Sequence, residues 1–486
     1  MTEITPILLG KGADKRYLLP SLGNRHGLIA GATGTGKTVS LQVLAEGFSR
    51  IGTPVFLADV KGDLSGLGAP IAPHPKVQER LDVIGIEDFA PAAFPVAFWD
   101  VEGTLGHPVR TTITEMGPLL LSGLLELNDT QEGVLNIAFR VADDEGLLLL
   151  DLDDLKQMLR FVGEQRQALS LEYGNISPAS VAAIQRRLLV LEEQGAQRFF
   201  GEPALALKDL MRQAPDGRGQ INSLAADRLI RQPRLYATIL LWLLSELFEE
   251  LPEVGDPDRP GLVFFFDEAH LLFDKAPPAL LESVEQIVRL IRSKGVGVYF
   301  ITQSPSDVPD DVLGQLGNRM QHALRAYTPR DQRAVKAAAQ TFRPNPELDT
   351  EAVITQLGVG EALISTLDEE GVPTMVDACL VRPPTSRIGP LDEKERKALM
   401  AVSDLGERYD TAIDRESAEE ILLARAKASA AKAERSKQKT QAKKKAARSR
   451  GDSSTQAMVK SFARSFGNLL GKELMRGVMG VLRKGR

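Results

Sequence analysis

One glycine-rich segment of eight residues, placed between an apolar run and a helical pattern, constrains this sequence more than any other feature. It reads GATGTGKT over residues 31–38 and fits the pattern G-x-x-x-x-G-K-[ST]. Glycines at these positions let backbone N–H groups surround phosphate oxygens, and the N-terminus of the following helix adds partial positive charge. Lys37 would reach the β- and γ-phosphates, and Thr38 would hold Mg²⁺. The segment predicts a nucleotide site made of Gly31, Ala32, Thr33, Gly34, Thr35, Gly36, Lys37 and Thr38.

Short apolar or β-branched runs, bounded by turn residues, recur along the chain and are typical of buried parallel strands. Helical patterns follow several of them, for example after Lys37 and over residues 278–292. This alternation predicts a doubly wound α/β fold with a mostly parallel sheet. The expected strands cover residues 26–31, 54–60, 95–101, 261–269, 295–303 and 322–328.

A second acidic site is needed to complete the metal coordination, and the apolar run from Leu262 to Phe266 ends in two carboxylates. Asp267 would bind Mg²⁺ directly or through water, and Glu268 would activate the attacking water as general base. A buried strand that ends in a solvated acidic turn is the alternative. The letters DEAH at residues 267–270 also occur in a helicase superfamily, but its Q-x-x-G-R-x-G-R element is absent downstream.

A polar amide, Gln303, ends a further apolar run at the position where an open α/β sheet presents its strand ends to a ligand. This side chain would sense the γ-phosphate or position water, and a simple strand-end cap is the alternative. The sequence lacks the N-K-x-D motif of GTPases and the L-S-G-G-Q motif of ABC-type ATPases. ATP and Mg²⁺ are therefore the expected cofactors.

Taken together, these motifs resemble the HerA/FtsK superfamily of hexameric DNA-pumping P-loop ATPases, in particular a bacterial HerA-like subfamily of helicase-like ATPases. The resemblance covers most of residues 20–385. It rests on the 31–38 segment, Asp59 within LADVKGD, the Asp267-Glu268 pair, RSKG at 292–295 and ITQ at 301–303. It implies a RecA-like P-loop core and a homo-hexameric motor that couples ATP hydrolysis to translocation on DNA.

The resemblance also implies that Arg292 acts as an arginine finger on the γ-phosphate held by the neighbouring subunit. A fixed guanidinium suits charge spread over a transferring phosphoryl group. An exposed basic helix end is the alternative, because Arg292 would also complement a helix dipole. Only 30 residues precede Gly31, too few for the N-terminal barrel through which HerA proteins dock a nuclease, so a nuclease partner is not expected.

Charge and amino-acid composition divide the 486-residue chain into segments. Its net charge of −6 combines +15 from residue 421 onward with −21 over the first 420 residues, so any nucleic-acid site on the body must be local. The stretch from 424 to about 450 is almost only Ala, Lys, Arg, Ser and Gln, which predicts a solvated helix or a flexible linker. The expected segments are the ATPase core (1–102 and 256–390), a Leu-rich helical insertion (103–255), a helical extension (391–423), a basic linker (424–457) and an amphipathic end (458–486).

The basic tail has three interpretations: contact with DNA phosphates, binding to an anionic membrane or protein groove through the apolar face of residues 458–478, or a solvated extension. A single cysteine, Cys379, together with the absence of a signal or a long apolar run, predicts a cytoplasmic protein. Two other functions stay open, an ATPase of the same fold acting on protein or RNA, and a nucleotide-binding scaffold. DNA-stimulated turnover would separate the motor from both.

Overall fold

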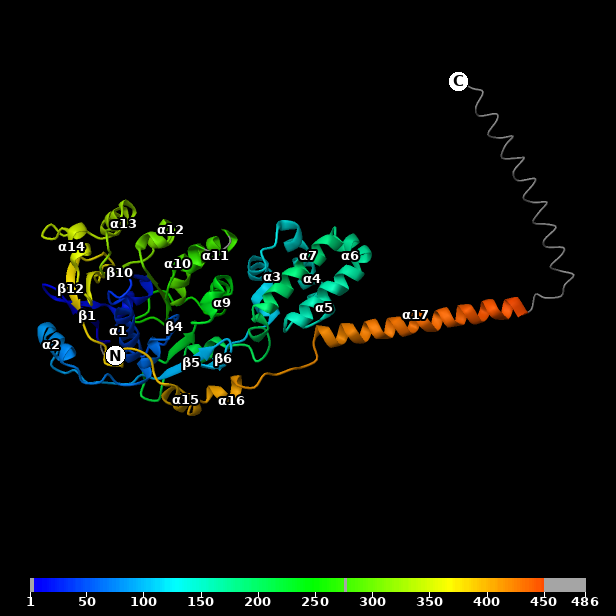
Figure 1. Cartoon of the computed structure of the whole chain (residues 1–486), viewed down its shortest axis with the longest axis horizontal. Coiled ribbons are helices and arrows are strands. Elements are labelled where there is room, and N and C mark those ends of the chain that lie inside the picture. Colours follow the sequence, from blue (N-terminus) through cyan, green and yellow to red (C-terminus); the bar gives the residue numbers. More distant parts are fainter. Residues whose placement is uncertain (1–3, 275–277, 450–486) are drawn as a thin grey trace, which may run out of the picture. The chain divides into compact units, whose positions relative to one another are not determined.

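The computed structural model describes residues 4–274 and 278–449 of the chain (Figure 1). Contacts between residues divide the chain into a unit of residues 1–419 and a unit of residues 420–486, which are described separately. Among the described residues, no helix combines the length and the apolar character needed to cross a membrane.

The first unit is built on one 12-stranded sheet with the order β2-β1-β12-β11-β10-β3-β9-β8-β4-β7-β5-β6. All neighbouring strands from β10 to β6 are parallel, whereas β2, β1, β12 and β11 form an antiparallel extension at one side. The predicted α/β fold with a mostly parallel sheet is confirmed. The strands are β1 Ile7–Lys11, β2 Lys15–Leu18, β3 Gly27–Ala30, β4 Val55–Asp59, β5 Val96–Asp100, β6 His107–Pro108, β7 Ile221–Ala225, β8 Leu262–Phe266, β9 Val296–Thr302, β10 Asn318–Gln321, β11 Glu361–Ser365 and β12 Asp377–Val381.

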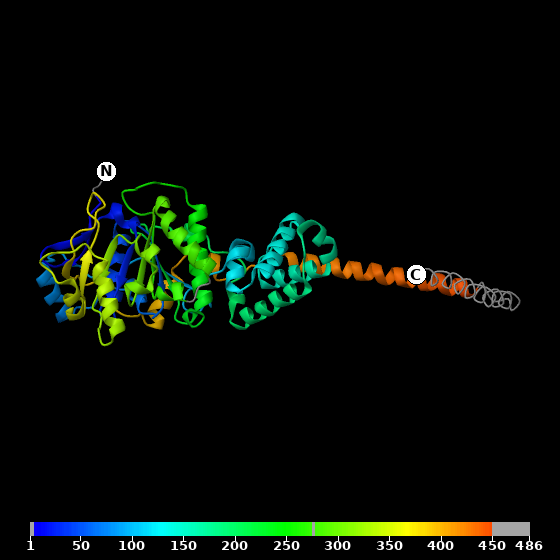
Figure 2. The same ribbon diagram turned by 90° about the horizontal axis from the view of Figure 1, so that it is seen from above.

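Helices connect these strands, and α3 to α7 pack against one another in a separate group (Figures 1 and 2). Their bounds are α1 Lys37–Arg50, α2 Pro75–Ile84, α3 Ile113–Leu124, α4 Asp129–Glu145, α5 Leu152–Glu164, α6 Arg166–Tyr173, α7 Pro178–Glu193, α8 Leu207–Leu210, α9 Pro233–Glu250, α10 His270–Asp274, α11 Pro278–Leu290, α12 Asp310–Leu313, α13 Pro329–Gln340, α14 Thr350–Gln356, α15 Glu393–Ala401, α16 Leu405–Tyr409 and α17 Ala418–Ser449.

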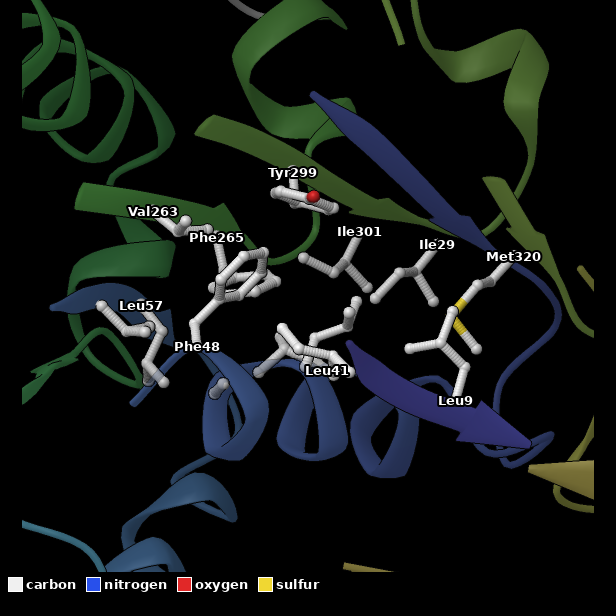
Figure 3. Close-up of a cluster of buried hydrophobic side chains, with 14 of the residues drawn as sticks. Leu9, Ile29, Leu41, Phe48, Leu57, Val263, Phe265, Tyr299, Ile301 and Met320 are labelled. Carbon is white, nitrogen blue, oxygen red and sulfur yellow. The ribbon is translucent and has the colours of Figure 1, made fainter. Parts of the chain in front are cut away.

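Helix α1 packs its apolar side against one face of the central strands, as Figure 3 shows. Phe48 lies 5.8 Å from Tyr299 of β9 and 6.4 Å from Phe265 of β8, measured between ring centroids. Leu41, one turn into the same helix, is also fully buried in this cluster. This packing fixes the start of α1 at the ends of the strands that carry the candidate site.

The strand predicted over residues 322–328 is wrong, because the sheet strand is β10, four residues earlier. After Gln321 the chain leaves the sheet. Its apolar residues Ala323 and Leu324 join a cluster under α13 and α14 instead, with Leu324 N donating to Ile354 O at 3.2 Å. Loop packing therefore produced the apolar pattern that resembled a strand.

The region predicted as a helical insertion, residues 103–255, also contains β7, which lies between β4 and β5 in the main sheet. The sequence did not predict β7, because this strand contains the polar residues Asn222 and Ser223. Asn222 is fully buried, and its amide donates to Val55 O (3.1 Å) and Leu210 O (2.8 Å) and accepts from Trp99 Nε1 (3.0 Å). The uninterrupted helical group is therefore α3–α7, shorter than the predicted insertion.

The basic stretch after residue 424 belongs to α17, and its side chains are exposed from Ala424 to Ala442. Ala, Lys and Gln favour helix, while the absence of an apolar face leaves nothing to pack. The predicted amphipathic end at 458–486 lies outside the described residues.

Glu46 of α1 joins this helix to the segment that follows β12. The carboxylate is buried and accepts hydrogen bonds from the backbone N–H groups and the hydroxyls of Thr385 and Ser386, at 2.6 to 2.9 Å. Replacing it leaves several buried donors without an acceptor, and each such donor costs about 1–3 kcal/mol. Glu46→Ala should therefore lower the free energy of unfolding by about 3 kcal/mol in urea denaturation. Glu79→Ala, at an exposed position of α2, is the control, and an equal effect of the two changes would contradict the prediction.

Candidate nucleotide-binding and hydrolytic site

The glycine-rich loop runs from the end of β3 into α1, the context that phosphate binding requires. Gly31 must be glycine because a Cβ there would lie 2.5 Å from the Cβ of His322. Gly36, at the N-cap of α1, has a φ of 118°, which a side chain would strain. The loop is therefore shaped by the backbone, and its first part is tied to the neighbouring strands, because Gly31 N donates to Thr302 O and Ala32 N donates to Ala323 O.

His322, to which no motif assigned a role, packs against this loop. Its Nε2 lies 2.8 Å from Ser40 Oγ of α1, and its Nδ1 lies 2.8 Å from Glu361 O of β11. Burial lowers the pKa of the ring to about 4, so it is neutral at physiological pH. The ring joins α1 to the antiparallel part of the sheet without adding charge near the phosphates.

The side chain of Lys37 is held by carbonyl groups of the phosphate-binding loop. Its Nζ donates to Gly31 O at 2.5 Å and to Ala32 O at 3.2 Å, and the side chain is buried. Burial lowers its pKa, as does the nearby charge of Lys61, while Glu268 and Asp267 oppose the shift. The ammonium thus lies between the loop carbonyls and the acidic pair, where a terminal phosphate would sit.

The acidic pair follows β8, two strands from β3 in the sheet. Asp267 Oδ1 accepts from the Glu268 N–H at 2.9 Å, and burial, followed by the charge of Glu268, raises the pKa of Asp267 to about 6. Glu268 adopts a φ of +49°, uncommon for a residue with a side chain, which turns it out of the strand direction. Such strain is typical of positions where a side chain must be aimed at a site.

Lys61, in the loop after β4, forms an ion pair with Glu268, with Nζ 3.1 Å from Oε1. Burial by itself raises the pKa of Glu268, but Lys61, Gln303 and His270 together outweigh it and lower that pKa. Glu268 is therefore a carboxylate at neutral pH, the state that a general base requires. Its Oε2 lies 3.4 Å from His270 Nδ1. Among the residues that the structure describes, no hydrogen bond to this oxygen is formed.

The end of β4 and the loop that follows it bring two aspartates to the site. Thr38 hydrogen-bonds the side chain of Asp63, and burial raises the pKa of Asp63. Asp59 Oδ2 accepts from Leu64 N at 3.1 Å, and burial, followed by the charge of Asp63, raises the pKa of Asp59 to about 7. A cation bound near Thr38 would therefore favour the ionised forms of these two carboxyls.

The described residues contain no group of three or more His, Cys, Asp and Glu side chains able to hold a metal alone. The arrangement fits Mg²⁺ bound together with phosphate oxygens and water, because Thr38 hydrogen-bonds Asp63, whose charge acts on Asp267. Among the residues that the structure describes, Asp59 Oδ1 is also a buried acceptor without a hydrogen-bond partner. When bound, the metal would neutralise charge on the phosphates. The residues that would hold it are Thr38 and, through water, Asp267.

Gln303 lies at the carboxyl end of β9, and its side chain hydrogen-bonds Glu268. Arg292 precedes the same strand, so the seven residues of β9, about 23 Å, separate the two. Its guanidinium Nη2 lies 3.1 Å from Asp256 Oδ1 at the opposite edge of the sheet. Of the predicted site residues, the structure thus brings Lys37, Asp267, Glu268 and Gln303 together around the loop but leaves Arg292 outside that group.

The HerA-like helicase C-terminal family matches residues 7–486. The chain belongs to this family. The resemblance drawn from the motifs is thereby confirmed, and the chain is a P-loop ATPase of the HerA/FtsK superfamily.

Similar folds occur among solved structures. The plasmid coupling protein TrwB, in complex with a non-hydrolysable GTP analogue, is 15% identical over 76% of this chain and 88% of that chain, with a TM-score of 0.51. VirB4 of Thermoanaerobacter pseudethanolicus is 14% identical over 80% of this chain and 98% of that chain, with a TM-score of 0.49. No curated protein matches the sequence.

Within this HerA-family chain, sequence reasoning assigned no role to Lys61, as it assigned none to His322. The stretch LADVKGD contains it, but no role followed from the letters, because only the sheet order places the end of β4 beside β8. Its position directly after an apolar strand was the available signal.

Lys61→Met should lower kcat roughly 10- to 100-fold and leave ATP affinity nearly unchanged, because Lys61 orients Glu268 rather than the phosphates held by the loop. The acid limb of the pH–rate profile should move to higher pH, since Lys61 lowers the pKa of Glu268. Phosphate release and equilibrium binding measure the two effects, and Lys61→Arg is the conservative control. An unchanged kcat in Lys61→Met would contradict the prediction.

Proposed function

We propose that this chain is the subunit of a hexameric ring that couples ATP hydrolysis to translocation on DNA. The observation that carries the proposal is the meeting of Lys37, Asp267, Glu268 and Gln303 around a phosphate-binding loop in a HerA-family chain. In this proposal Lys37 binds the terminal phosphates, Thr38 and Asp267 hold Mg²⁺, and Glu268 takes the proton of the attacking water. Gln303 orients Glu268 and reports whether the γ-phosphate is present.

In the proposed ring, a neighbouring subunit adds a further positive charge to the site that holds Lys37 and Lys61. Arg292 lies at the amino end of β9, outside its own site, on a half-exposed 3-10 turn of residues 291–294. Its partner Asp256 is 60% exposed, so the ion pair is an open one that a stronger anion can replace. We therefore assign Arg292 to the site of the neighbouring subunit, where it would neutralise charge on the transferring phosphoryl group.

Mixing two inactive variants tests this assignment. Arg292→Ala subunits and Glu268→Gln subunits should each lack turnover, whereas mixed rings should recover part of it, because some sites combine an intact Glu268 with an intact neighbouring Arg292. Phosphate release measures the recovery, and native mass spectrometry verifies that the rings are mixed. Mixed rings that stay inactive would show that Arg292 acts only as a helix-end charge.

The body of the protein is acidic overall, and α13 carries a local basic surface that suits a DNA backbone. Arg330, Arg333 and Lys336 are exposed on this helix, whose other side is anchored by buried apolar residues. Arg325 and Tyr327 precede the helix, and the Tyr327 side chain is 86% exposed. Cations interspersed with an aromatic ring are typical of nucleic-acid contacts. We define these five residues as the α13 surface.

The α13 surface is also joined to the hydrolytic site. Helix α13 contacts the 3-10 turn Pro305–Asp307, which follows Gln303 almost directly. Asp307 Oδ2 in that turn accepts from Thr302 Oγ1 at 2.6 Å and from Ser304 N at 2.9 Å. A load on α13 would thus shift the segment that carries Gln303, giving DNA a route to the hydrolysis rate.

Reversing the charge of Arg330, Arg333 and Lys336 to Glu should weaken binding to double-stranded DNA and abolish DNA stimulation of the ATPase. The slope of log affinity against log salt should flatten by about three units, since each lost phosphate contact removes roughly 0.9. The matched control reverses Arg140, Arg160 and Arg166, three exposed cations of the helical group. ATP binding checks that each variant is folded.

The outcomes separate the candidate functions. If the triple variant binds DNA as wild type does, the DNA surface lies elsewhere, with the basic tail after residue 424 as the next candidate for contact with DNA or an anionic membrane. If RNA or protein stimulates the wild-type ATPase and DNA does not, the alternative remodelling function replaces translocation. A cytoplasmic location remains part of the proposal.

A further inference from the structure

A pocket of about 570 Å³ lies at the end of α1 that is remote from the phosphate-binding loop. Its walls come from the second half of α1, from β1 and β2, from residues 85–92 after α2, and from the segment after β12 (Figure 1). Arg50, which lines it, lies about 20 Å along the helix axis from Lys37. The pocket is therefore separate from the place of hydrolysis.

Two guanidinium groups from distant parts of the chain line this pocket, Arg50 at the end of α1 and Arg382 directly after β12. Arg50 is fixed in position, because its guanidinium carbon lies 5.3 Å from the ring centroid of Phe94 and its Nη2 donates to Thr385 Oγ1. Arg382 donates from Nε to Pro383 O at 3.3 Å. In the part of the chain that the structure describes, the two terminal nitrogens of Arg382 form no hydrogen bond or ion pair.

The charges around Arg382 favour the binding of an anion. Burial lowers the pKa of this guanidinium, and the charge of Arg50 lowers it further, whereas Glu46 and Asp88 act in the opposite direction. The Glu46 carboxylate already accepts the hydrogen bonds of Thr385 and Ser386, and Asp88 is exposed to solvent that screens its charge. An anion bound between the two guanidiniums would offset their mutual repulsion.

The walls indicate which kind of anion fits. Guanidinium groups donate paired hydrogen bonds to phosphate oxygens, and a phosphate monoester carries nearly two negative charges at neutral pH. Ile7, Val43 and Phe89 add an apolar surface beside the two arginines, and the volume lies within the range usual for ligand pockets. We propose that this pocket binds a small phosphate monoester with an apolar body, and that Arg50 and Arg382 hold its phosphate.

Phenyl phosphate, which combines the two chemical features, is the probe. Calorimetry on the full chain carrying Lys37→Ala measures its binding without a contribution from the phosphate-binding loop, and the wild-type chain saturated with Mg²⁺-ADP should give the same affinity. Adding Arg382→Ala should weaken binding roughly 10- to 100-fold, the effect expected when charge-assisted hydrogen bonds are lost. Arg140→Ala, at a position of α4 whose side chain is 68% exposed, is the matched control and should leave the affinity unchanged.

Two further variants keep the test independent of any folding defect in Arg382→Ala, because both positions are exposed in the pocket wall. Asp88→Asn removes an opposing negative charge and should tighten binding roughly two- to fivefold. Ala90→Trp fills the pocket with a ring and should abolish binding. Inorganic phosphate, which lacks the apolar body, and benzoate, which lacks the phosphate, should each bind roughly tenfold more weakly than phenyl phosphate.

The results that would contradict the proposal are distinct. Phenyl phosphate that does not bind the Lys37→Ala chain in the millimolar range, or that binds all folded variants with one affinity, would overturn the assignment of the pocket. Benzoate that binds as tightly as phenyl phosphate would overturn the choice of a phosphate ligand. Neither result bears on the proposed ATPase, because the loop and the acidic pair take no part in this pocket.

Discussion

The site depends on one geometric constraint, that parallel strands place their carboxyl ends at the same edge of a sheet. The order β3-β9-β8-β4 brings the glycine-rich loop, Gln303, the acidic pair and Lys61 to neighbouring positions, although they span about half of the chain. Helix α1 is held under the same strands by Phe48 against Phe265 and Tyr299. If this helix shifted, the loop would lose its position relative to Glu268.

Charge balance around that edge sets the protonation states that the chemistry needs. Burial alone would protonate the carboxyls, and for Asp59 and Asp267 it raises the pKa to about 7 and about 6. The pKa of Glu268 is lowered instead, because Lys61 lies 3.1 Å away and Gln303 forms a hydrogen bond with its carboxylate. Neighbouring carboxyls with separated pKa values are a recurrent property of hydrolytic sites.

The hydrolytic site, the α13 surface and Arg292 lie at different places on the molecule. The phosphate-binding loop and the acidic pair lie around the start of α1, whereas the cations of the α13 surface lie beyond the turn that follows Gln303. Arg292 lies at the other edge of the sheet, where it forms an ion pair with Asp256. An acidic body with a few such cationic places confines contact with a polyanion to them.

The sequence by itself determined the local parts. The loop at 31–38, the run ending at Asp267 and Glu268, and Gln303 each carry their signal within a few neighbouring residues, and the alternation of runs and helices was enough for the α/β fold. Three features needed the tertiary structure. Strand β7 was not predicted because it contains the polar residue Asn222. Asn222 can be buried because Val55, Leu210 and Trp99 form hydrogen bonds with its amide. The run at 322–328 contains apolar residues because this loop packs under two helices. A local sequence pattern cannot distinguish such a loop from a strand.

Lys61 is the third such feature, and it shows the reason most plainly. A lysine in a loop has no meaning until its strand is known to lie beside the one that ends in Glu268, and strand order is a long-range property that no short window contains. The residues that bind phosphate are thus determined by local backbone geometry and are readable in the sequence. The residues that tune them are determined by which strands become neighbours, and only the folded chain decides that.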